Sequence, residues 1–321
     1  INFSAVGLTG KDIVPLLYSD TASAAIANFG QRAFKHAAPT DYKCLCTQNL
    51  DDLFGEADKN NPSKYFDITT YTGDGNSTRT ITGVFDFAAD LVWSKNRSTT
   101  NNNQIYDRIR GDGNRLHPDS DIAENTNSGT YGFVEAGTAA GSIDIIDGSD
   151  GSYNMNESGN KFVVWAWDAG TAASGANNDG SLNIASGDQW TNQTAGFSIT
   201  KYTGPGSGDF TFGHGLNAVP DFIIIKQIDA TGNWIVQHKD ITLGSGRLIL
   251  NSNTSASTSH ADIYWNSTAP TNTLISIGDN SNVYDNGGTF ICYAWTPIPG
   301  YSAFGKYTGN DDTDGPFVYT G

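Results

Sequence analysis

The chain carries one pattern twice, and this duplication constrains its fold more than any other feature. Phe66–Gly73 (Phe-Asp-Ile-Thr-Thr-Tyr-Thr-Gly) returns as Phe197–Gly204 (Phe-Ser-Ile-Thr-Lys-Tyr-Thr-Gly), and Lys306–Gly309 begins a third copy. Each copy is far longer than the roughly 20–50-residue unit of solenoids and propeller blades. The sequence therefore predicts domains duplicated in a row, an arrangement that serves reach and display, whereas an enzyme usually needs one site.

The agreement between the copies continues downstream. Asp90 and Asp221 each open an apolar run, which ends in Lys95 in the first copy and in Lys226 in the second. We expect each aspartate to begin a strand, and each lysine to end it with its stem packed and its ammonium group in solvent. Further matched pairs are Arg115-Leu116 with Arg247-Leu248, and Phe162–Trp167 with Phe290–Trp295.

Short apolar segments alternate with turn residues through both copies, which is the pattern of sandwiches and barrels. Strands are expected at 66–72, 79–87, 90–95, 104–110, 131–136, 142–146 and 161–168, and again at 197–203, 208–213, 221–227, 233–238, 246–251, 262–266, 273–277 and 289–296. Nothing in the order of segments favours a βαβ unit. The predicted fold class is all-β, built of tandem antiparallel β-sandwich domains of the jelly-roll or lectin-like kind.

Turn-rich and Gly-rich stretches divide the chain. The expected parts are the C-terminal strands of an incomplete β domain at 1–46, a linker with a short helix (Gln48–Asp58) at 47–64, repeat 1 at 65–172, a Gly/Asn/Ser-rich linker at 173–195, repeat 2 at 196–300, and the start of a truncated third repeat at 301–321.

Charge and cysteine content exclude several classes of function. A net charge of −16 argues against a nucleic-acid partner, which needs a clustered basic surface. No apolar run approaches the roughly 18 residues of a membrane helix, so no membrane insertion is predicted. Cys44, Cys46 and Cys292 are too few for a disulfide framework, and we expect free, mostly buried thiols in a protein that folds in a reducing cytoplasm.

Several motifs, taken in order, resemble those of marine bacteriophage proteins. Phe29–Phe34 and Pro39–Leu50 are similar to the C-terminal end of SPRY-type lectin-like sandwiches. The two repeats resemble the domain that commonly follows in such phage proteins. The motifs that carry this second likeness are the Tyr-Thr-Gly turn, Asp90–Arg97, Val163–Trp167, Gly213–Leu216 and Gly309–Gly321. The SPRY-like part lacks most of a full domain.

This resemblance implies a virion structural protein, a tail or fibre component assembled in the host cytoplasm that presents its domains for adsorption to host polysaccharide. It implies other virion proteins as partners and, by analogy with phage fibres, a homotrimer. The alternative is a capsid-decorating or tail-assembly protein that packs only against other virion proteins. The resemblance carries over no catalytic or binding residue.

The tryptophans supply the candidate ligand-binding residues. Trp190, Trp234 and Trp265 stand in polar stretches without clear aromatic counterparts in the other copy. They are the candidates for exposed aromatic residues that bind sugar, with ordinary packing as the plainer interpretation. The tryptophans expected to be core, because the other copy carries an apolar residue at the matching place, are Trp93, Trp165 and Trp167.

One acidic loop offers oxygen ligands of the kind that calcium prefers. Its candidate residues are Asp147, Asp150, Asn154 and Glu157, with solvated turn residues as the plainer interpretation. No other cofactor is predicted. No Gly-x-Ser-x-Gly elbow, His-Glu-x-x-His motif or phosphate loop occurs, so no catalytic residue is named and the chain is not expected to be an enzyme. A depolymerase remains the alternative, because paired carboxylates are defined only by their separation in space.

Overall fold

The computed structural model describes residues 61–137, 139–149, 155–206 and 208–318. This part is 6% helix and 34% strand, and every strand pairing in it is antiparallel, so the predicted all-β sandwich is confirmed. None of its helices has the length and apolarity that a membrane span requires. The predictions for 1–46, for the helix at Gln48–Asp58 and for Cys44 and Cys46 lie outside the described residues.

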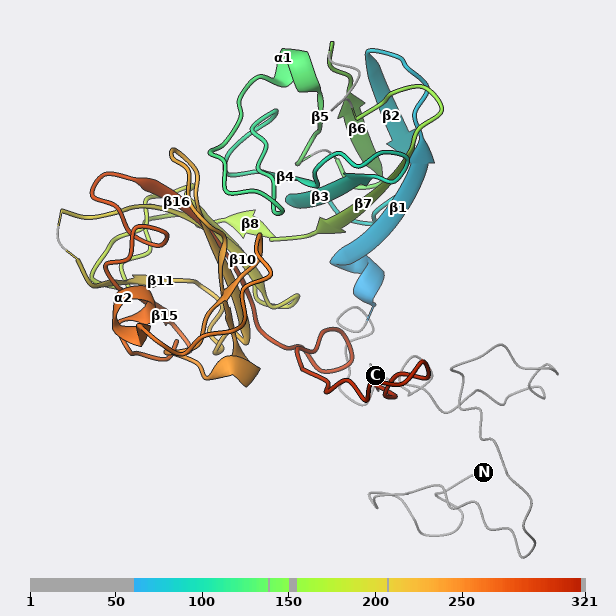
Figure 1. The fold of residues 1–321 in the computed structure, drawn as a ribbon. Helices are drawn as coiled ribbons and strands as arrows, with labels where there is room; N and C mark the ends of the chain where they lie inside the picture. The colour runs from blue at the N-terminus through green and yellow to red at the C-terminus, as the bar shows by residue number, and fades with distance from the viewer. Residues whose placement is uncertain (1–60, 138, 150–154, 207, 319–321) are drawn as a thin grey trace, which may run out of the picture. The chain divides into compact units, whose positions relative to one another are not determined.

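The first copy consists of two antiparallel sheets (Figure 1). The main sheet has the order β1-β7-β3-β4, and the small sheet has the order β2-β6-β5. The strands are β1 (Phe66–Thr72), β2 (Thr78–Thr82), β3 (Leu91–Asn96), β4 (Gln104–Asp107), β5 (Phe133–Val134), β6 (Ser142–Ile146) and β7 (Lys161–Trp167). A 3-10 turn η3 (Pro62–Lys64) precedes β1, and a short helix α1 (Ser128–Tyr131) precedes β5.

The second copy repeats this plan with a larger main sheet, of order β14-β13-β12-β16-β10-β9-β8, and a small sheet β11-β15. Its strands are β8 (Thr171–Ala172), β9 (Gln189–Asn192), β10 (Phe197–Thr203), β11 (Phe210–Gly213), β12 (Phe222–Gln227), β13 (Ile235–His238), β14 (Leu248–Ile249), β15 (Leu274–Ile277) and β16 (Thr289–Trp295). Its helical turns are η4 (Lys239–Ile241) and α2 (Ala261–Trp265).

Strand pairing shows the duplication residue by residue. Phe66 lies opposite Trp167 in the first copy, as Phe197 lies opposite Trp295 in the second. The order β1-β7-β3-β4 therefore matches β10-β16-β12-β13. Side chains repeat as well: the hydroxyl of Tyr71 donates to the Met155 carbonyl (2.5 Å), and that of its counterpart Tyr202 donates to the Val283 carbonyl (2.6 Å).

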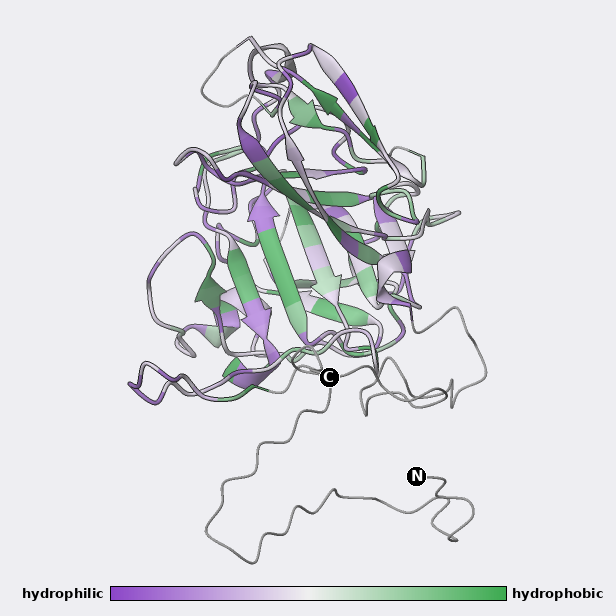
Figure 2. Cartoon of the chain, turned by 90° about the vertical axis from the view of Figure 1, so that its right-hand side faces the viewer, coloured by the Kyte–Doolittle hydropathy of each residue, from purple (hydrophilic) through white to green (hydrophobic). Residues whose placement is uncertain are grey.

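Each copy has its own core between its two sheets, and a third core joins the copies. The alternation of strand residues sends one face inward, which gives the cores around Phe162 in copy 1 and Phe290 in copy 2. Each main sheet also has a face that points away from its own core, and these two faces pack together in the third core. There Leu91 and Ile105 of copy 1 pack with Ile224 and Val236 of copy 2. Apolar residues accordingly fill the middle of the strands, whereas loops are hydrophilic (Figure 2).

The shared core corrects two predictions. The copies are not domains strung in a row, because the described residues of both copies fall into one compact unit. The stretch 173–195 is also more than a linker, since β9 pairs with β10 and Ile184 is buried in the second copy's core. Its Gly, Asn and Ser content masked the few apolar residues that attach it to the sheet.

The predicted strand at 262–266 is wrong, because these residues form α2, whose Tyr264 and Trp265 are buried. His260 and Asn266 flank this helix in the left-handed region, with φ of 64° and 48°. A strand at 131–136 is likewise reduced to β5, with α1 before it. Within residues 301–318, no strand forms; Tyr307 and Phe317 are exposed there.

The paired aspartates begin strands as predicted, but the lysine prediction is wrong for the second copy. Asp90 and Asp221 directly precede β3 and β12. Lys226 is fully buried, with its Nζ donating to the carbonyls of Gln227 (2.5 Å) and Ala230 (3.4 Å). Its counterpart Lys95 is half-buried, and its Nζ donates to the Asn101 carbonyl. Both lysines stabilise the loop that follows their strand, and the contact between the copies buries one of them.

Candidate functional site

A row of apolar side chains crosses the outer face of the first copy's main sheet. Ile68, Trp165 and Trp93 are direct cross-strand partners on β1, β7 and β3. Partners in register project on the same side of a sheet and lie next to one another. Ile68 is 49% exposed, and both tryptophans are half-buried. Trp93 packs against the third core at one end of the row, and its Nε1 donates to the Asn103 side chain (3.2 Å), so Ile68 and Trp165 are the more open members. We call these three residues the open row.

The matching row in the second copy is closed. Its residues are Ile199, Tyr293 and Ile224, paired in the same register on β10, β16 and β12. Tyr293 is 1% exposed, and the other two are also buried in the third core. One surface therefore exists in two states, covered in copy 2 and partly bare in copy 1.

The cover on the second copy comes from two sources. β9 extends its sheet, placing Trp190 beside Ile199, and the guanidinium of Arg108 from copy 1 lies 4.6 Å from the centre of the Trp190 ring. Arg108 also binds the buried Asp90 carboxylate through Nε (2.6 Å). Burial raises the pKa of Asp90 to about 7, against the opposing effect of Arg108.

Strand β1 is an edge of its sheet in the described part of the chain, whereas its counterpart β10 is flanked by β9. Asp67 stands on this edge where the second copy has Ser198. Its carboxylate accepts the outward backbone N–H of Ile68 (2.7 Å). A charged group that occupies edge hydrogen-bonding positions discourages a further strand from pairing, so the open row keeps free access from this side.

Basic residues lie beyond the open row on the same face. Lys95 and Arg97 follow Trp93 at alternate positions of the chain, and Lys161 precedes Trp165 by four residues on the antiparallel strand β7, so all three lie on the face of the open row and at the same end. The Arg97 N–H donates to the Lys161 carbonyl (2.7 Å), which holds these two residues side by side. We call Lys95, Arg97 and Lys161 the basic end. Their counterparts in copy 2 are Lys226, Ile228 and Thr289.

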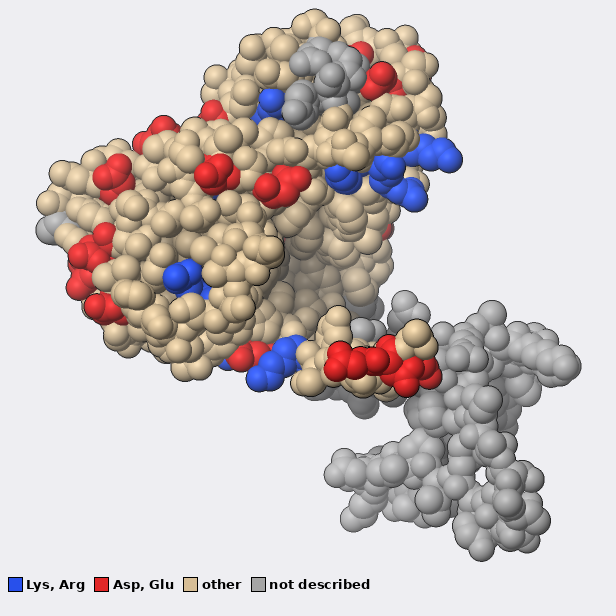
Figure 3. Space-filling model, viewed as in Figure 1, with Lys and Arg blue, Asp and Glu red and all other residues tan. Residues whose placement is uncertain are grey.

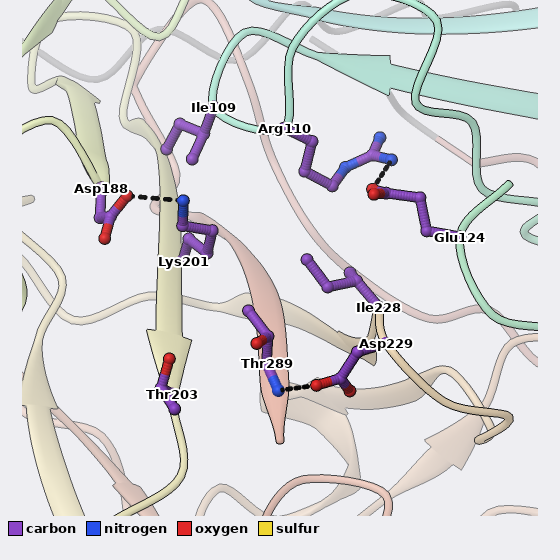
Figure 4. Close-up of a pocket in the computed structure, with 9 residues that line it drawn as sticks. All are labelled: Ile109, Arg110, Glu124, Asp188, Lys201, Thr203, Ile228, Asp229 and Thr289. Carbon is purple, nitrogen blue, oxygen red and sulfur yellow. Dashed lines mark hydrogen bonds and ion pairs between the residues drawn. The ribbon is translucent and has the colours of Figure 1, made fainter. Parts of the chain in front are cut away.

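A cleft occupies the corresponding end of the second copy, where copy 1 forms a roof over it (Figure 4). Its volume is about 480 Å³, which is large enough for a small molecule. The second copy contributes Asp188, Lys201, Thr203, Ile228, Asp229 and Thr289, and the first copy contributes Ile109, Arg110 and Glu124.

Charged groups in the cleft already have partners. Lys201 pairs with Asp188 (2.8 Å) and Arg110 with Glu124 (3.0 Å), while the Asp229 carboxylate accepts the Thr289 N–H (2.8 Å). A ligand would have to compete with these contacts. The cleft is therefore a weaker candidate than the open row, where Ile68 is exposed and Trp165 is half-buried.

Behind the cleft, a buried network connects the copies. The Arg110 Nε donates to Asp107 (2.5 Å), and the hydroxyl of Tyr293 donates to the same Asp107 oxygen (2.6 Å). Arg110 also donates to the carbonyls of Ile105 and Asn114. Burial raises the pKa of Tyr293 well above its usual value, so its hydroxyl stays a donor. The network is a structural link rather than a reactive site.

Two of the three candidate ligand-binding tryptophans are buried, as the packing interpretation expects. Trp234 is fully buried, and its Nε1 donates to the carbonyls of His117 (2.8 Å) and Ser120 (3.1 Å) of copy 1. Trp265 is 1% exposed and donates to the Gly246 carbonyl (3.0 Å). Trp190 is half-buried beneath Arg108. Polar neighbours in sequence gave no signal of these contacts, which come from distant loops.

The tryptophans expected to be core behave differently from one another. Trp167 packs against the third core as its counterpart Trp295 does, and Trp93 packs there too, which agrees with the expected core role of both. Trp165 lies half-buried in the open row although its counterpart Tyr293 is buried, so the shared core role is wrong for it. The alternation of Lys161, Val163 and Trp165 along one face was the available signal for this site.

The calcium candidates lie only partly in the described residues, since Asp150 and Asn154 fall outside them. Asp147 accepts the Gly148 N–H (3.0 Å), and Glu157 accepts from the Asn160 side chain (2.7 Å). Burial raises the pKa of Asp147, and the neighbouring carboxylates of Glu157 and Asp74 raise it further. Among the described residues, no group of three or more His, Cys, Asp or Glu side chains is arranged to hold a metal ion.

Two side chains of the second copy that could be reactive, Cys292 and His214, are both buried. Cys292 is a buried free thiol, as expected. The Gly213-His214-Gly215 stretch is a turn at the end of β11, in which Gly215 has φ of 75°. His214 is buried there, and burial lowers its pKa to about 4. Its Nδ1 accepts the Leu216 N–H (3.3 Å) and so stabilises the turn.

Comparison with known families adds one finding. The model of a domain of unknown function (DUF7483) matches residues 61–321. The chain belongs to this family. A single DUF7483 domain spans both copies, which agrees with the core that they share. The curated proteins and the solved structures that were compared give no match.

Proposed function

We propose that this chain is a non-catalytic carbohydrate-binding structural protein that holds glycan on the open row. The observation that carries the proposal is the pair Trp165 and Trp93, half-buried side by side on a flat sheet face whose counterpart in copy 2 is closed. The C–H face of a sugar ring packs on an indole face, and the exposed edge of the indole tolerates water.

The resemblance of its motifs to phage proteins supplies the setting that we propose. The chain would be part of the tail or fibre of a bacteriophage particle, where it displays the open row to polysaccharide on the host surface. The acidic surface supports this setting, because high net charge keeps a displayed protein soluble. A homotrimer, by analogy with phage fibres, belongs to the same proposal.

A second function uses the same bare face for protein packing, in a capsid-decorating or tail-assembly protein. The observation in favour of this packing function is that the matching row of the second copy is covered by protein. Stable protein contacts bury about 1,200–2,000 Å² in total, so such a partner would have to extend well beyond three residues of the open row.

The test is binding of the purified chain to an array of bacterial surface oligosaccharides, with the variant Trp165→Ala. Loss of the indole should lower affinity roughly 10-fold or more, since a buried aromatic contact contributes about 1–3 kcal/mol. Leu250→Ala is the matched control, because Leu250 is also an exposed apolar side chain but lies outside the open row. Binding that is unchanged by Trp165→Ala would refute the proposed site and favour the packing function.

A further inference from the structure

The basic end places three cationic side chains beside the open row. The chain has 34 acidic and 18 basic residues. Three of those basic residues, Lys95, Arg97 and Lys161, nevertheless lie at one end of one sheet face. Figure 3 shows basic side chains gathered on one side of the first copy, at the upper right of the view, whereas acidic side chains are spread over the described surface.

These three cations have no carboxylate partner in the described part of the chain. Elsewhere in it, Arg79, Arg108, Arg110, Lys201 and Lys239 each form an ion pair. Lys161 and Arg97 are exposed, and Lys95 is held by the Asn101 carbonyl with donors to spare. In a protein with an excess of carboxylates, an unpaired group of this kind is available to an external anion.

The second copy shows that the fold does not require the charges. At the places of Arg97 and Lys161 it has Ile228 and Thr289, which keep the same backbone hydrogen bond (2.9 Å against 2.7 Å). Two of the three charges of the basic end are therefore present only in the copy whose face is open, and the third, Lys95, corresponds to the buried Lys226.

We propose that the open row and the basic end together bind an acidic polysaccharide whose charges are ring carboxylates, that is, a uronic-acid glycan. One sugar ring stacks on Trp165 or Trp93, and carboxylates along the chain reach Lys161, Arg97 and Lys95. Lys161 stands four residues from Trp165, about 13 Å along the strand, so a ring stacked on the indole and the carboxylates of neighbouring rings make the two kinds of contact. A uronic-acid glycan carries a carboxylate on each ring and therefore fits this spacing. Arg97 offers the planar fork that matches a carboxylate. This inference rests on the proposed function.

The experiment is calorimetric titration of the full chain with oligogalacturonate and with its methyl ester, which has the same backbone and masked charges. We expect the acid to bind about 10-fold more tightly than the ester, because the ester cannot form the two or three exposed ion pairs with the basic end. Added salt should weaken the binding of the acid and leave the binding of the ester unchanged.

Variants separate the two proposals. Lys161→Thr, which introduces the residue of the second copy, and Arg97→Gln should each lower affinity for the acid about 2- to 5-fold and leave the ester unchanged. Trp165→Ala should weaken both ligands. Lys306→Thr is the control, since it removes the same charge from the exposed C-terminal segment and should change neither affinity.

Three outcomes would overturn the inference. They are equal binding of acid and ester, an acid affinity unchanged in both basic-end variants, and dextran sulfate bound as tightly as oligogalacturonate with the same losses. In each of these cases the proposed function stands if Trp165→Ala still weakens binding. If Trp165→Ala weakens neither ligand, the proposed function itself fails.

Discussion

The hydroxyl of Tyr293 donates to Asp107 across the boundary between the two copies, at 2.6 Å. The same Asp107 oxygen accepts from Arg110, and its other oxygen accepts the backbone N–H groups of Ile109 (3.0 Å) and Arg110 (2.9 Å). A residue of copy 2 thus completes the hydrogen bonds of a buried carboxylate in copy 1. The duplicated sequence has become one folding unit through contacts that the repeat itself does not encode.

Tyr293→Phe should therefore destabilise the protein by about 1–3 kcal/mol, because a buried charged acceptor loses one of its donors. Urea unfolding measures the change. Tyr284→Phe is the matched control: its hydroxyl donates to the neutral Pro205 carbonyl (2.8 Å) within one copy, so its loss should be smaller. An equal loss of unfolding free energy in the two variants would show that the hydrogen bond between the copies stabilises the protein no more than one within a copy.

The shared core should make both copies unfold together. Strands β7 and β16 occupy matching places in different copies, and both contribute side chains next to the third core. We expect peptides from these strands to show the same opening free energy in native-state hydrogen exchange. An opening of one strand at clearly lower denaturant concentration would show that the copies are independent domains.

Much of this architecture could be predicted from the sequence. The bounds of β1, β6 and β10 agree with the expected strands, because alternating residues between turn signals specify a strand locally. Contacts from distant loops could not be predicted: Trp234 is buried by two carbonyls of the other copy. The open row was missed for a related reason, since Tyr293 and Trp165 have the same place in the repeat and differ only in what covers them.

Lys226 should make stability depend on pH above neutrality. Burial lowers its pKa from 10.5 to about 8, with the nearby carboxylates of Asp121 and Asp229 opposing the shift. Between pH 8 and 10.5 the unfolded chain then binds more protons than the folded one, so the free energy of unfolding gains a contribution that rises with pH. Lys226→Met should lack this rise, as thermal unfolding across that range would show. A parallel pH profile in the variant would contradict the assignment, and Lys306→Gln should keep the profile of the unmodified chain.

The edge of β1 supplies a prediction about association. Asp67→Ser, which introduces the residue of the second copy, removes the charge that occupies the edge N–H. We expect the variant to self-associate at concentrations where the unmodified chain does not, because an unguarded edge strand can pair with another chain. Sedimentation velocity would measure this. Asp312→Ser removes an equal charge from the exposed C-terminal segment and should leave the association state unchanged.

The most direct test of the account is fluorine NMR of the chain labelled with 5-fluorotryptophan, titrated with oligogalacturonate. Seven tryptophans give separate reporters, assigned by substitution. If the open row binds the glycan, the signals of Trp165 and Trp93 should shift on binding, whereas those of the buried Trp234 and Trp265 should stay in place. Shifts confined to Trp190 or absent from all seven residues would contradict the claim that this face is the binding surface.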